Sequence, residues 1–381
     1  MYQSTPPPAL ARDRRRSTFR RLVASIAAST LLITACSAQA GTGTVAPSPA
    51  DPVGPAGSGA APSVAAPQGT LKLGYFPNIT HATAIVGVES GIFQKALGPG
   101  VTFTVSSFNA GPAASEALLN GAIDATFIGP NPAINAFAKS NGAAIRIIAG
   151  ATSGGAYLVV KPEITSAAGL RGKKVASPQL GNTQDVALRT WLADNGLVTT
   201  KEGGGDVSIL PQDNAQTLDA FKSGQIDGAW VPEPWATRLV QEGGGKVLVD
   251  EKTLWPGGQY VTTHLIVRTD YLQAHPDIIR ALLAGELEAN DLVNGDPAPA
   301  QALTNQGIKK ITSKTIADKV ITAAWPNLTF TVDPIASSLK GSADHATKVG
   351  LLDPVNLTGI YDLTLLNELL QAAGKPAVGG L

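Results

Sequence analysis

The sequence contains one repeated pattern, and this repeat limits the folds that the chain can adopt. Residues 121–124 (Gly-Ala-Ile-Asp) recur as residues 224–227 (Gly-Gln-Ile-Asp), an offset of 103 positions, and Phe127 falls on Trp230 at the same offset. Each copy alternates short apolar segments with longer helical segments, separated by loops of Gly, Pro and Asn. Such alternation predicts two β-α-β-α-β-α units, each building a parallel sheet with helices wound on both faces.

The predicted elements line up in the two copies. The expected strands of the first copy are residues 71–75, 101–108 and 123–128, and those of the second copy are residues 175–176, 207–210 and 226–231. A helix follows each strand, and four helices are expected to end near the Ser-Gly or Asn-Gly pairs 90–91, 120–121, 195–196 and 223–224. Because ligands bind open α/β sheets at the carboxyl ends of the strands, the loops of both copies are expected to line one cleft between two lobes.

Two extended segments are expected to join the lobes. Residues 156–160 leave the first lobe and residues 260–267 return to it, while residues 276–370 read mainly as helices. The predicted limits are 69–156 plus 264–381 for lobe one and 157–263 for lobe two. Two crossings make a hinge, so the lobes are expected to close around a ligand.

The first 36 residues are predicted to be a secretory signal. Six arginines precede Leu22–Ala35, a mostly apolar run of 14 residues. This run is too short to span a bilayer, which needs about 20 residues, and fits a signal peptide instead. It leads into Cys36 through a sequence that resembles a bacterial lipobox, so Cys36 is the predicted lipid anchor, with a spare or buried cysteine as the alternative. The pair Arg15-Arg16 leaves open whether export is general or twin-arginine.

Residues 37–68 are predicted to form a flexible tether. The stretch holds six prolines, no aromatic residue and one charged residue, Asp51. It cannot bury enough apolar surface to offset the cost of ordering the chain. As a coil it would span roughly 30 Å, which suits a globule held just above a membrane. A processed pro-segment is the alternative.

The composition argues against several classes of function. Cys36 is the only cysteine, so neither disulfides nor thiol catalysis is expected in the rest of the chain. Without the predicted signal, 23 basic residues face 28 acidic ones, which argues against a nucleic-acid surface. The four histidines, at positions 81, 264, 275 and 345, lack the spacing of metal ligands, and neither a P-loop nor a serine nucleophile elbow is found. We therefore expect no metal, no cofactor and no catalysis.

The loops after the predicted strands supply the candidate binding residues. In the first copy these are Asn78, Thr80, His81, Gly111, Gly129 and Asn131, and in the second copy they are Gly181, Asn182 and Thr183. Free N–H groups and polar side chains at a helix start can hold an anion. Simple helix capping is the alternative for Asn78 and Thr80, and a favourable charge at the helix start is the expected role of Asp185.

The loop at residues 230–235 (Trp-Val-Pro-Glu-Pro-Trp) holds two of the five tryptophans. Trp230 or Trp235 is expected to form a wall of the pocket and to cover the apolar part of a ligand, with core packing as the alternative for either ring. Glu233 is expected to pair with a ligand ammonium group or with an arginine of the protein.

Taken together, these stretches resemble the nitrate/sulfonate/taurine family of ABC-transporter solute-binding proteins, and most closely its aliphatic-sulfonate binders. The stretches that carry the resemblance are residues 73–81, 109–113, 121–124, 128–132, 178–185 and 230–235. The resemblance implies an α/β chain with the two-lobed type II periplasmic-binding-protein fold, in which two doubly wound sheets are joined by two hinge crossings. It also implies a monomer that holds an anionic head group at helix N-termini.

The resemblance implies capture of a small organic anion, first of all an aliphatic sulfonate, for an ABC permease and its ATPase subunit. The protein would work outside the cytoplasm, anchored to the cell membrane through Cys36. Taurine, nitrate, bicarbonate, a pyrimidine precursor or a nitrile-like compound stay open as ligands, although the tryptophans favour an organic tail. One rival is an enzyme on the same scaffold, such as the cysteine-rich pyrimidine-synthase relatives. The other is the effector domain of a regulator, which would carry a helix-turn-helix where this chain has the signal and tether.

Overall fold

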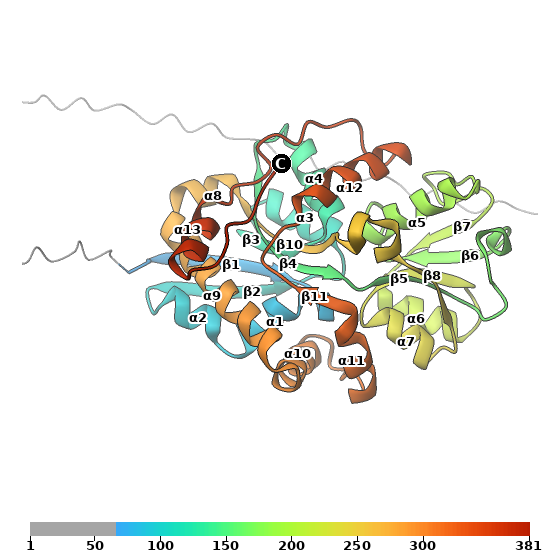
Figure 1. Cartoon of the computed structure of the whole chain (residues 1–381), viewed down its shortest axis with the longest axis horizontal. Coiled ribbons are helices and arrows are strands. Elements are labelled where there is room, and N and C mark those ends of the chain that lie inside the picture. The colour runs from blue at the N-terminus through green and yellow to red at the C-terminus, as the bar shows by residue number, and fades with distance from the viewer. Residues whose placement is uncertain (1–65) are drawn as a thin grey trace, which may run out of the picture. The chain divides into compact units, whose positions relative to one another are not determined.

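A computed structural model describes residues 66–381, so the predicted signal, Cys36 and residues 37–65 of the tether lie outside the described residues. The described chain forms two sheets that lie side by side, each flanked by helices (Figure 1). We call the first sheet with its helices the first lobe, and the second sheet with its helices the second lobe.

The first sheet has six strands in the order β11-β4-β10-β3-β1-β2. They are β1 (Gly69–Tyr75), β2 (Val101–Ser107), β3 (Ala125–Ile128), β4 (Ile145–Gly154), β10 (Val261–Arg268) and β11 (Leu328–Phe330). Strand β1 is parallel to β2 and β3, whereas β10 is antiparallel to β3 and β4, and β11 is antiparallel to β4.

The second sheet has five strands in the order β7-β6-β8-β5-β9. They are β5 (Ala156–Val160), β6 (Lys174–Ser177), β7 (Ser208–Pro211), β8 (Gly228–Pro232) and β9 (Lys246–Asp250). Strands β7, β6 and β8 are parallel, and β5 is antiparallel to both β8 and β9. The strands of both repeated units are therefore parallel as predicted, although each sheet as a whole is mixed. The chain extends each sheet with strands of the opposite direction as it passes between the lobes.

The helices cover both faces of each sheet, as a doubly wound fold requires. In the first lobe they are α1 (Ala82–Glu89), α2 (Ile92–Leu97), α3 (Gly111–Leu119), α4 (Pro130–Lys139), α8 (Thr269–Ala274), α9 (Pro276–Gly295), α10 (Pro297–Thr312), α11 (Asp318–Ala324), α12 (Ala336–Lys348) and α13 (Thr364–Ala372). In the second lobe they are α5 (Thr183–Asp194), α6 (Asn214–Lys222) and α7 (Trp235–Gln241). None of the helices in the described part of the chain combines the length and the apolar character that crossing a membrane requires.

Each sheet separates two hydrophobic clusters, because neighbouring residues of a strand point to opposite faces. In β3, Phe127 packs into the cluster with α1 and α9, while Ile128 packs into the cluster with α3 and α4. In β8, Trp230 packs toward α5, and Val231 packs toward α6 and α7. Phe127 and Trp230, which the repeat places at equivalent positions, are both fully buried. The repeat thus reflects two cores built in the same way.

The chain passes from the first sheet to the second at two consecutive glycines. Gly154 ends β4 with φ 79° and Gly155 precedes β5 with φ 74°, a left-handed conformation that other residues rarely adopt. The carbonyl oxygen of Gly154 accepts a hydrogen bond from Thr262 Oγ1 at 2.6 Å, and that of Gly155 accepts one from Glu233 N at 2.8 Å. The return crossing leads into β10 at Val261, so the extended segment 260–267 is part of the first sheet itself. The exact lobe limits of the sequence analysis stay a prediction.

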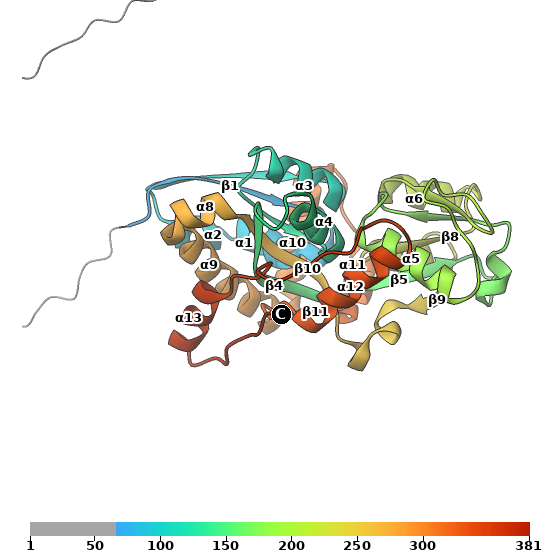
Figure 2. The same cartoon turned by 90° about the horizontal axis from the view of Figure 1, so that it is seen from above.

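Helices α11 and α12 lie between the two groups of strands in both views (Figures 1 and 2). Helix α12 packs against α4 and also against α5, and α11 packs against α7. Among the described residues, five polar contacts that involve a side chain connect the lobes: Trp235 Nε1 to Asn78 Oδ1 at 2.8 Å, Asn109 Nδ2 to Asp213 Oδ2 at 3.1 Å, Asn327 Nδ2 to Glu233 Oε1 at 2.7 Å, Thr190 Oγ1 to the carbonyl oxygen of His345 at 3.4 Å, and an ion pair of Lys348 with Asp194. The lobes therefore touch around the cleft.

We expect Gly155→Ala to destabilise the protein by about 2–4 kcal/mol. A left-handed alanine costs roughly 1–2 kcal/mol, and its Cβ would also overlap the side chain of Leu328. The matched control is Gly350→Ala, where φ is 71° but no atom lies within 4 Å of the added Cβ, so only the conformational cost applies. Urea denaturation of both variants measures the difference. Equal losses would show that Leu328 does not crowd the crossing.

Candidate functional site

A cavity of about 20 Å³ lies between the lobes, beside the carboxyl ends of strands from both sheets. Its lining residues are Phe76, Asn78, Thr80, His81, Asn109, Gly129, Pro178, Asn182, Thr183, Gln184, Asn214, Pro232, Thr262 and Thr263. Such a volume admits about one water-sized group. The lobes approach each other closely here, since a Cβ built at Gly129 would overlap Thr183 Oγ1 across the cleft.

The structure brings six of the twelve predicted binding residues together in this cavity: Asn78, Thr80, His81, Gly129, Asn182 and Thr183. Five of the other eight lining residues lie in the stretches that carry the family resemblance, although they were not predicted to bind: Phe76, Asn109, Pro178, Gln184 and Pro232. The remaining three, Asn214, Thr262 and Thr263, were not expected at the site. Thr262 and Thr263 stand at the start of β10, which is otherwise apolar apart from His264 and Arg268. A polar start to a buried strand was therefore the signal that could have identified them.

His81 forms part of the first-lobe wall in the neutral state. Its ring lies 4.3 Å from the ring of Phe76, centroid to centroid, and its Nδ1 accepts a hydrogen bond from Phe76 N at 3.4 Å. Burial lowers the pKa of His81 to about 3. With Nδ1 as the acceptor, the single ring hydrogen of a neutral imidazole is on Nε2. His81 can therefore donate one hydrogen bond but carries no charge at neutral pH.

The second-lobe wall is built by the starts of α5 and α6. Asn182 caps α5, with its Oδ1 accepting from Thr183 N at 2.5 Å. Thr183 Oγ1 and Asn214 Oδ1 are both buried and have no hydrogen-bond partner among the described residues. A buried polar atom without a partner is costly, so these two atoms mark where the cavity can satisfy a ligand. The free N–H groups at both helix starts add to this polar wall.

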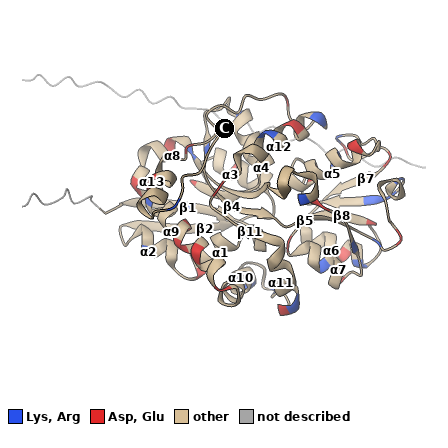
Figure 3. Cartoon of the chain, viewed as in Figure 1, with Lys and Arg blue, Asp and Glu red and all other residues tan. Residues whose placement is uncertain are grey.

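Among the residues that the structure describes, only uncharged ones line the cavity. Neither a Lys nor an Arg is among the lining side chains. In Figure 3 the strands of both sheets are mostly tan, and the charged positions lie mainly on helices and outer loops. An anion in this cavity would therefore be held by neutral hydrogen-bond donors and backbone dipoles.

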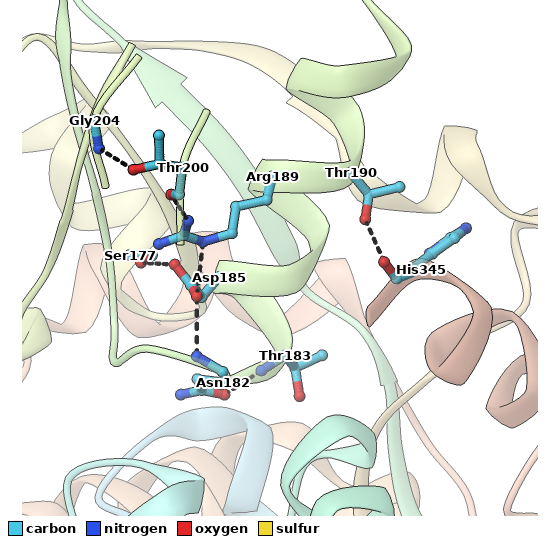
Figure 4. A network of polar contacts seen from close by, with 10 residues as sticks. Ser177, Asn182, Thr183, Asp185, Arg189, Thr190, Thr200, Gly204 and His345 are labelled. Atoms are coloured by element: carbon cyan, nitrogen blue, oxygen red, sulfur yellow. Dashed lines mark hydrogen bonds and ion pairs between the residues drawn. The ribbon is translucent and has the colours of Figure 1, made fainter. Parts of the chain in front are cut away.

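A network of buried charges lies directly behind the second-lobe wall (Figure 4). Asp185 Oδ2 accepts from Gly181 N at 2.9 Å, and Asp185 Oδ1 accepts from Ser177 Oγ at 2.7 Å. Arg189 Nε donates to Asp185 Oδ2 at 3.0 Å, and Arg189 Nη1 donates to the carbonyl oxygen of Thr200 at 2.6 Å. Asp185 thus does more than complement the helix dipole, because it ties loop 178–183 to α5.

A second pocket of about 190 Å³ adjoins the cavity and shares Asn78, Asn109 and Asn214 with it. The other lining residues are Pro77, Asp213, Ala215, Pro234, Trp235, Arg238, Ile308, Thr312, Lys314, Thr315 and Ile316. The guanidinium of Arg238 lies 4.8 Å from the ring centre of Trp235 and binds Glu242 through two hydrogen bonds. Trp235 thus lines a pocket that adjoins the cavity. Such a position is compatible with its predicted role as a wall for the ligand.

Capping does not explain Asn78. Asn78 stands at the N-cap of a short 3-10 helix, Ile79–His81, but its side chain makes no capping bond and accepts from Trp235 Nε1 instead. Asp213 behaves similarly, because it stands at the N-cap of α6 and accepts from Asn109 without capping the helix. Both side chains connect the lobes.

Trp230 lies in the core of the second lobe and not in the cavity. Its ring is fully buried against Trp191, and its Nε1 donates to Glu251 Oε2 at 2.7 Å. The repeat already indicated a core position for Trp230, because the equivalent residue of the first copy, Phe127, also lies in the hydrophobic core. The expectation of a pocket wall at Trp230 is corrected accordingly.

The structure places the remaining four predicted residues outside the cavity. Glu233 is buried and accepts from Thr237 and from Asn327, so its partners belong to the protein and neither is an arginine; burial raises its pKa. Asn131 donates to the carbonyl oxygen of Ser342 at 2.9 Å. Gly111 packs against Pro132, and Gly181 lines a separate surface groove.

The described residues hold no group of three or more His, Cys, Asp or Glu side chains placed to bind a metal ion.

Comparison with known proteins is consistent with this geometry. Residues 64–306 match the model of the NMT1-like family. The chain is 28% identical over 246 residues to the bicarbonate-binding protein CmpA of Synechococcus sp., covering 58% of this chain and 53% of the relative. It is 26% identical over 201 residues to the taurine-binding periplasmic protein of Escherichia coli K12, covering 52% of this chain and 59% of the relative. The chain thus spans about half the length of the curated relatives it matches.

Among solved structures, the alkanesulfonate-binding protein SsuA from Xanthomonas axonopodis pv. citri, bound to MOPS, superposes with a TM-score of 0.64 at 20% identity. The match covers 76% of this chain and 96% of that one. This likeness confirms the predicted two-lobed type II periplasmic-binding-protein fold.

We expect Glu251→Gln to stabilise the protein increasingly as the pH rises. Burial raises the pKa of Glu251 to about 7 from an ordinary value of 4.5. A carboxyl group that binds its proton more tightly in the folded chain loses stability as the pH rises through this window, and the cost is complete above it. Glutamine removes the cost and keeps an acceptor for Trp230.

Thermal unfolding between about pH 5 and pH 8 tests this expectation. The difference in Tm between Glu251→Gln and the wild type should grow by several degrees across the range. Glu163→Gln, at an exposed position, serves as the control and should show no such trend. A difference that does not change with pH would contradict the assignment.

Proposed function

Because the chain belongs to the NMT1-like family, we propose that it is an extracytoplasmic solute-binding protein that captures a small anion between its two lobes for an ABC importer. The observation that carries this proposal is the inter-lobe cavity, which uncharged polar groups from both lobes line, including Thr183 Oγ1, which has no hydrogen-bond partner among the described residues. The partners are a permease and its ATPase subunit. Lipidation of Cys36 anchors the protein, as a monomer, to the outer face of the cell membrane.

We propose an aliphatic sulfonate as the ligand. Its head group is larger than the one water-sized group that the cavity admits in this structure, so the lobes have to move apart to take it in. Its head group keeps its charge at every physiological pH and accepts hydrogen bonds without donating any, which matches a cavity of neutral donors such as His81 and Thr183. The adjoining pocket of about 190 Å³ offers apolar surface at Trp235, Ile308 and Ile316 for a tail. The printed functions of the relatives, which bind bicarbonate, taurine or alkanesulfonate, support an anion and leave its tail open.

Taurine, nitrate, bicarbonate and a pyrimidine precursor are the alternative ligands. Glu233 gives taurine no particular support, because its carboxylate already accepts from Thr237 and Asn327. A bare inorganic ion would leave the Trp235 pocket unused. An enzyme on this scaffold is the remaining rival, and turnover of a bound compound would establish it.

Calorimetric titration of the full chain, purified in mild detergent, tests the proposal with ethanesulfonate, hexanesulfonate, taurine, nitrate and bicarbonate. We expect micromolar or tighter binding of the two alkanesulfonates, with the bound compound recovered unchanged. Binding of nitrate or bicarbonate alone would keep the solute-binding role and overturn the sulfonate assignment. If the folded protein binds none of the five compounds, this result would count against an anion site in this cavity.

We expect substitutions at Trp235 and Thr183 to separate tail binding from head-group binding. Trp235→Phe loses the hydrogen bond to Asn78 but keeps an aromatic wall, whereas Trp235→Ala loses both. The loss of affinity from Phe to Ala should therefore grow from ethanesulfonate to hexanesulfonate, at up to about 0.8 kcal/mol for each methylene group that the ring covers. The same difference for both ligands would exclude the wall.

Thr183→Val serves as the head-group counterpart. The variant removes a buried hydroxyl that has no partner among the described residues, so folding stability should stay the same or rise. Affinity should fall by about 1–2 kcal/mol, equally for both tail lengths, because the head group loses one hydrogen bond. Unchanged affinity would show that Thr183 does not face the ligand.

A further inference from the structure

Asp185 creates an electrostatic problem for the anion site proposed above. Its carboxylate lies in the first turn of α5, where Asn182 and Thr183 line the cavity. A helix start stabilises a negative charge, and Asp185 uses that favourable position before any ligand arrives. The carboxylate is fully buried, so solvent does not screen it. An uncompensated charge here would repel an anion in the cavity.

The carboxylate is nevertheless needed for the shape of the site. It accepts from Gly181 N and from Ser177 Oγ, and these two bonds fold loop 178–183 back onto the helix start (Figure 4). The loop supplies Pro178 and Asn182 to the cavity wall. Removing the carboxylate would remove the repulsion but would also release the loop.

Arg189, one helical turn further along α5, compensates the negative charge of Asp185 and leaves the loop in place. Its side chain is 1% exposed, and its Nε lies 3.0 Å from Asp185 Oδ2. A second bond, from Nη1 to the carbonyl oxygen of Thr200, fixes the guanidinium on the side of the carboxylate away from the cavity lining. Nη2 has no partner among the described residues, so one bond to the carboxylate and one to the carbonyl oxygen of Thr200 hold the arginine. The pair is neutral as a whole.

Other cations do not take over this task. Arg238, which lines the adjoining pocket, is bound by both carboxylate oxygens of Glu242. Lys314 lines the same outer pocket, and no Lys or Arg lines the cavity itself. Among the described residues, the ion pair that Asp185 forms is the one with Arg189.

We propose that Arg189 sets the anion affinity of the cavity without touching the ligand, by neutralising the carboxylate that shapes the ligand loop. Arg189 is thus a positioning and charge-compensating residue. The inference rests on the proposed anion-binding function and adds to it the residue that makes the buried loop compatible with an anion.

The test is a charge cycle of three variants, Arg189→Gln, Asp185→Asn and the double variant, titrated with ethanesulfonate, hexanesulfonate and nitrate. The protein is the full chain in mild detergent. Arg189→Gln leaves one uncompensated carboxylate behind the cavity wall and should weaken binding about tenfold or more, because at an effective dielectric constant of about 20 a unit charge still acts on an anion several ångströms away. The double variant is neutral again, and its amide can still accept from Gly181 N, so it should recover to within about threefold of the wild type.

The recovery separates charge compensation from a merely structural role. If Arg189 only holds the fold together, the double variant should bind the anions no more tightly than Arg189→Gln, and this result would overturn the inference. Wild-type affinity in Arg189→Gln would overturn it as well. The loss should also be the same for ethanesulfonate and hexanesulfonate, because the charge acts on the head group and not on the tail.

One control variant and the wild-type titration keep the outcome clear. Arg189→Lys keeps the charge, so it should bind within about threefold of the wild type. If Arg189→Gln does not fold, Arg189→Lys and the double variant test the inference instead. A tenfold loss of affinity in either of these two variants, relative to the wild type, then overturns the inference. If the wild type binds none of the three anions, the proposed function fails, which differs from a wild type that binds and a cycle that shows no coupling.

Discussion

The arrangement of the whole site depends on how the chain turns from one sheet into the other at Gly154 and Gly155. Both residues have left-handed backbones, and both carbonyl oxygens accept hydrogen bonds from the loops that border the cleft. One acceptor holds Thr262, at the start of the return strand, and the other holds Glu233, at the end of β8. The crossing thereby fixes the strand ends of both lobes against each other. A site assembled from two sheets needs such a fixed crossing, because neither sheet alone presents donors on more than one side of a ligand.

The sequence predicted the parts of this structure that repeat and missed the parts that join the repeats. The offset of 103 residues located the six parallel strands and the loops that follow them, because local propensity and turn chemistry are the same in both copies. It did not reveal that β5 and β10 extend the sheets with antiparallel strands, since strand direction follows from long-range pairing. The misassignment of Trp230 has a different cause. A tryptophan in a loop motif suggested a ligand wall, although its partner in the repeat, Phe127, already indicated a core position.

Half of the predicted binding residues line the cavity. A residue at a helix start lines the cavity when no other helix covers that start. Asn182 and Thr183 face the cleft because α5 begins there, pointing its free N–H groups at the opposite lobe. Asn131 also stands at a helix start, but α12 covers it, and its side chain donates to Ser342 instead. The helix that covers Asn131 lies more than 200 positions later in the sequence, so no local sequence pattern could predict this packing. Local sequence finds helix starts, and tertiary packing decides which of them stay available.

The energetics of an uncharged anion site explain why the lobes must close. One helix start contributes at most about 2 kcal/mol to binding an anion, whereas micromolar affinity needs about 8 kcal/mol. The difference has to come from hydrogen bonds made in a dry environment and from contacts between the lobes, such as Trp235 with Asn78 and Asn109 with Asp213. These contacts favour closure whatever the ligand is, so they add to affinity without adding discrimination between anions. Discrimination must then come from the space that closure leaves. Thr183 and Gly129 set this space by meeting across the cleft, and a larger residue at Gly129 would change which head groups fit without removing a side-chain donor.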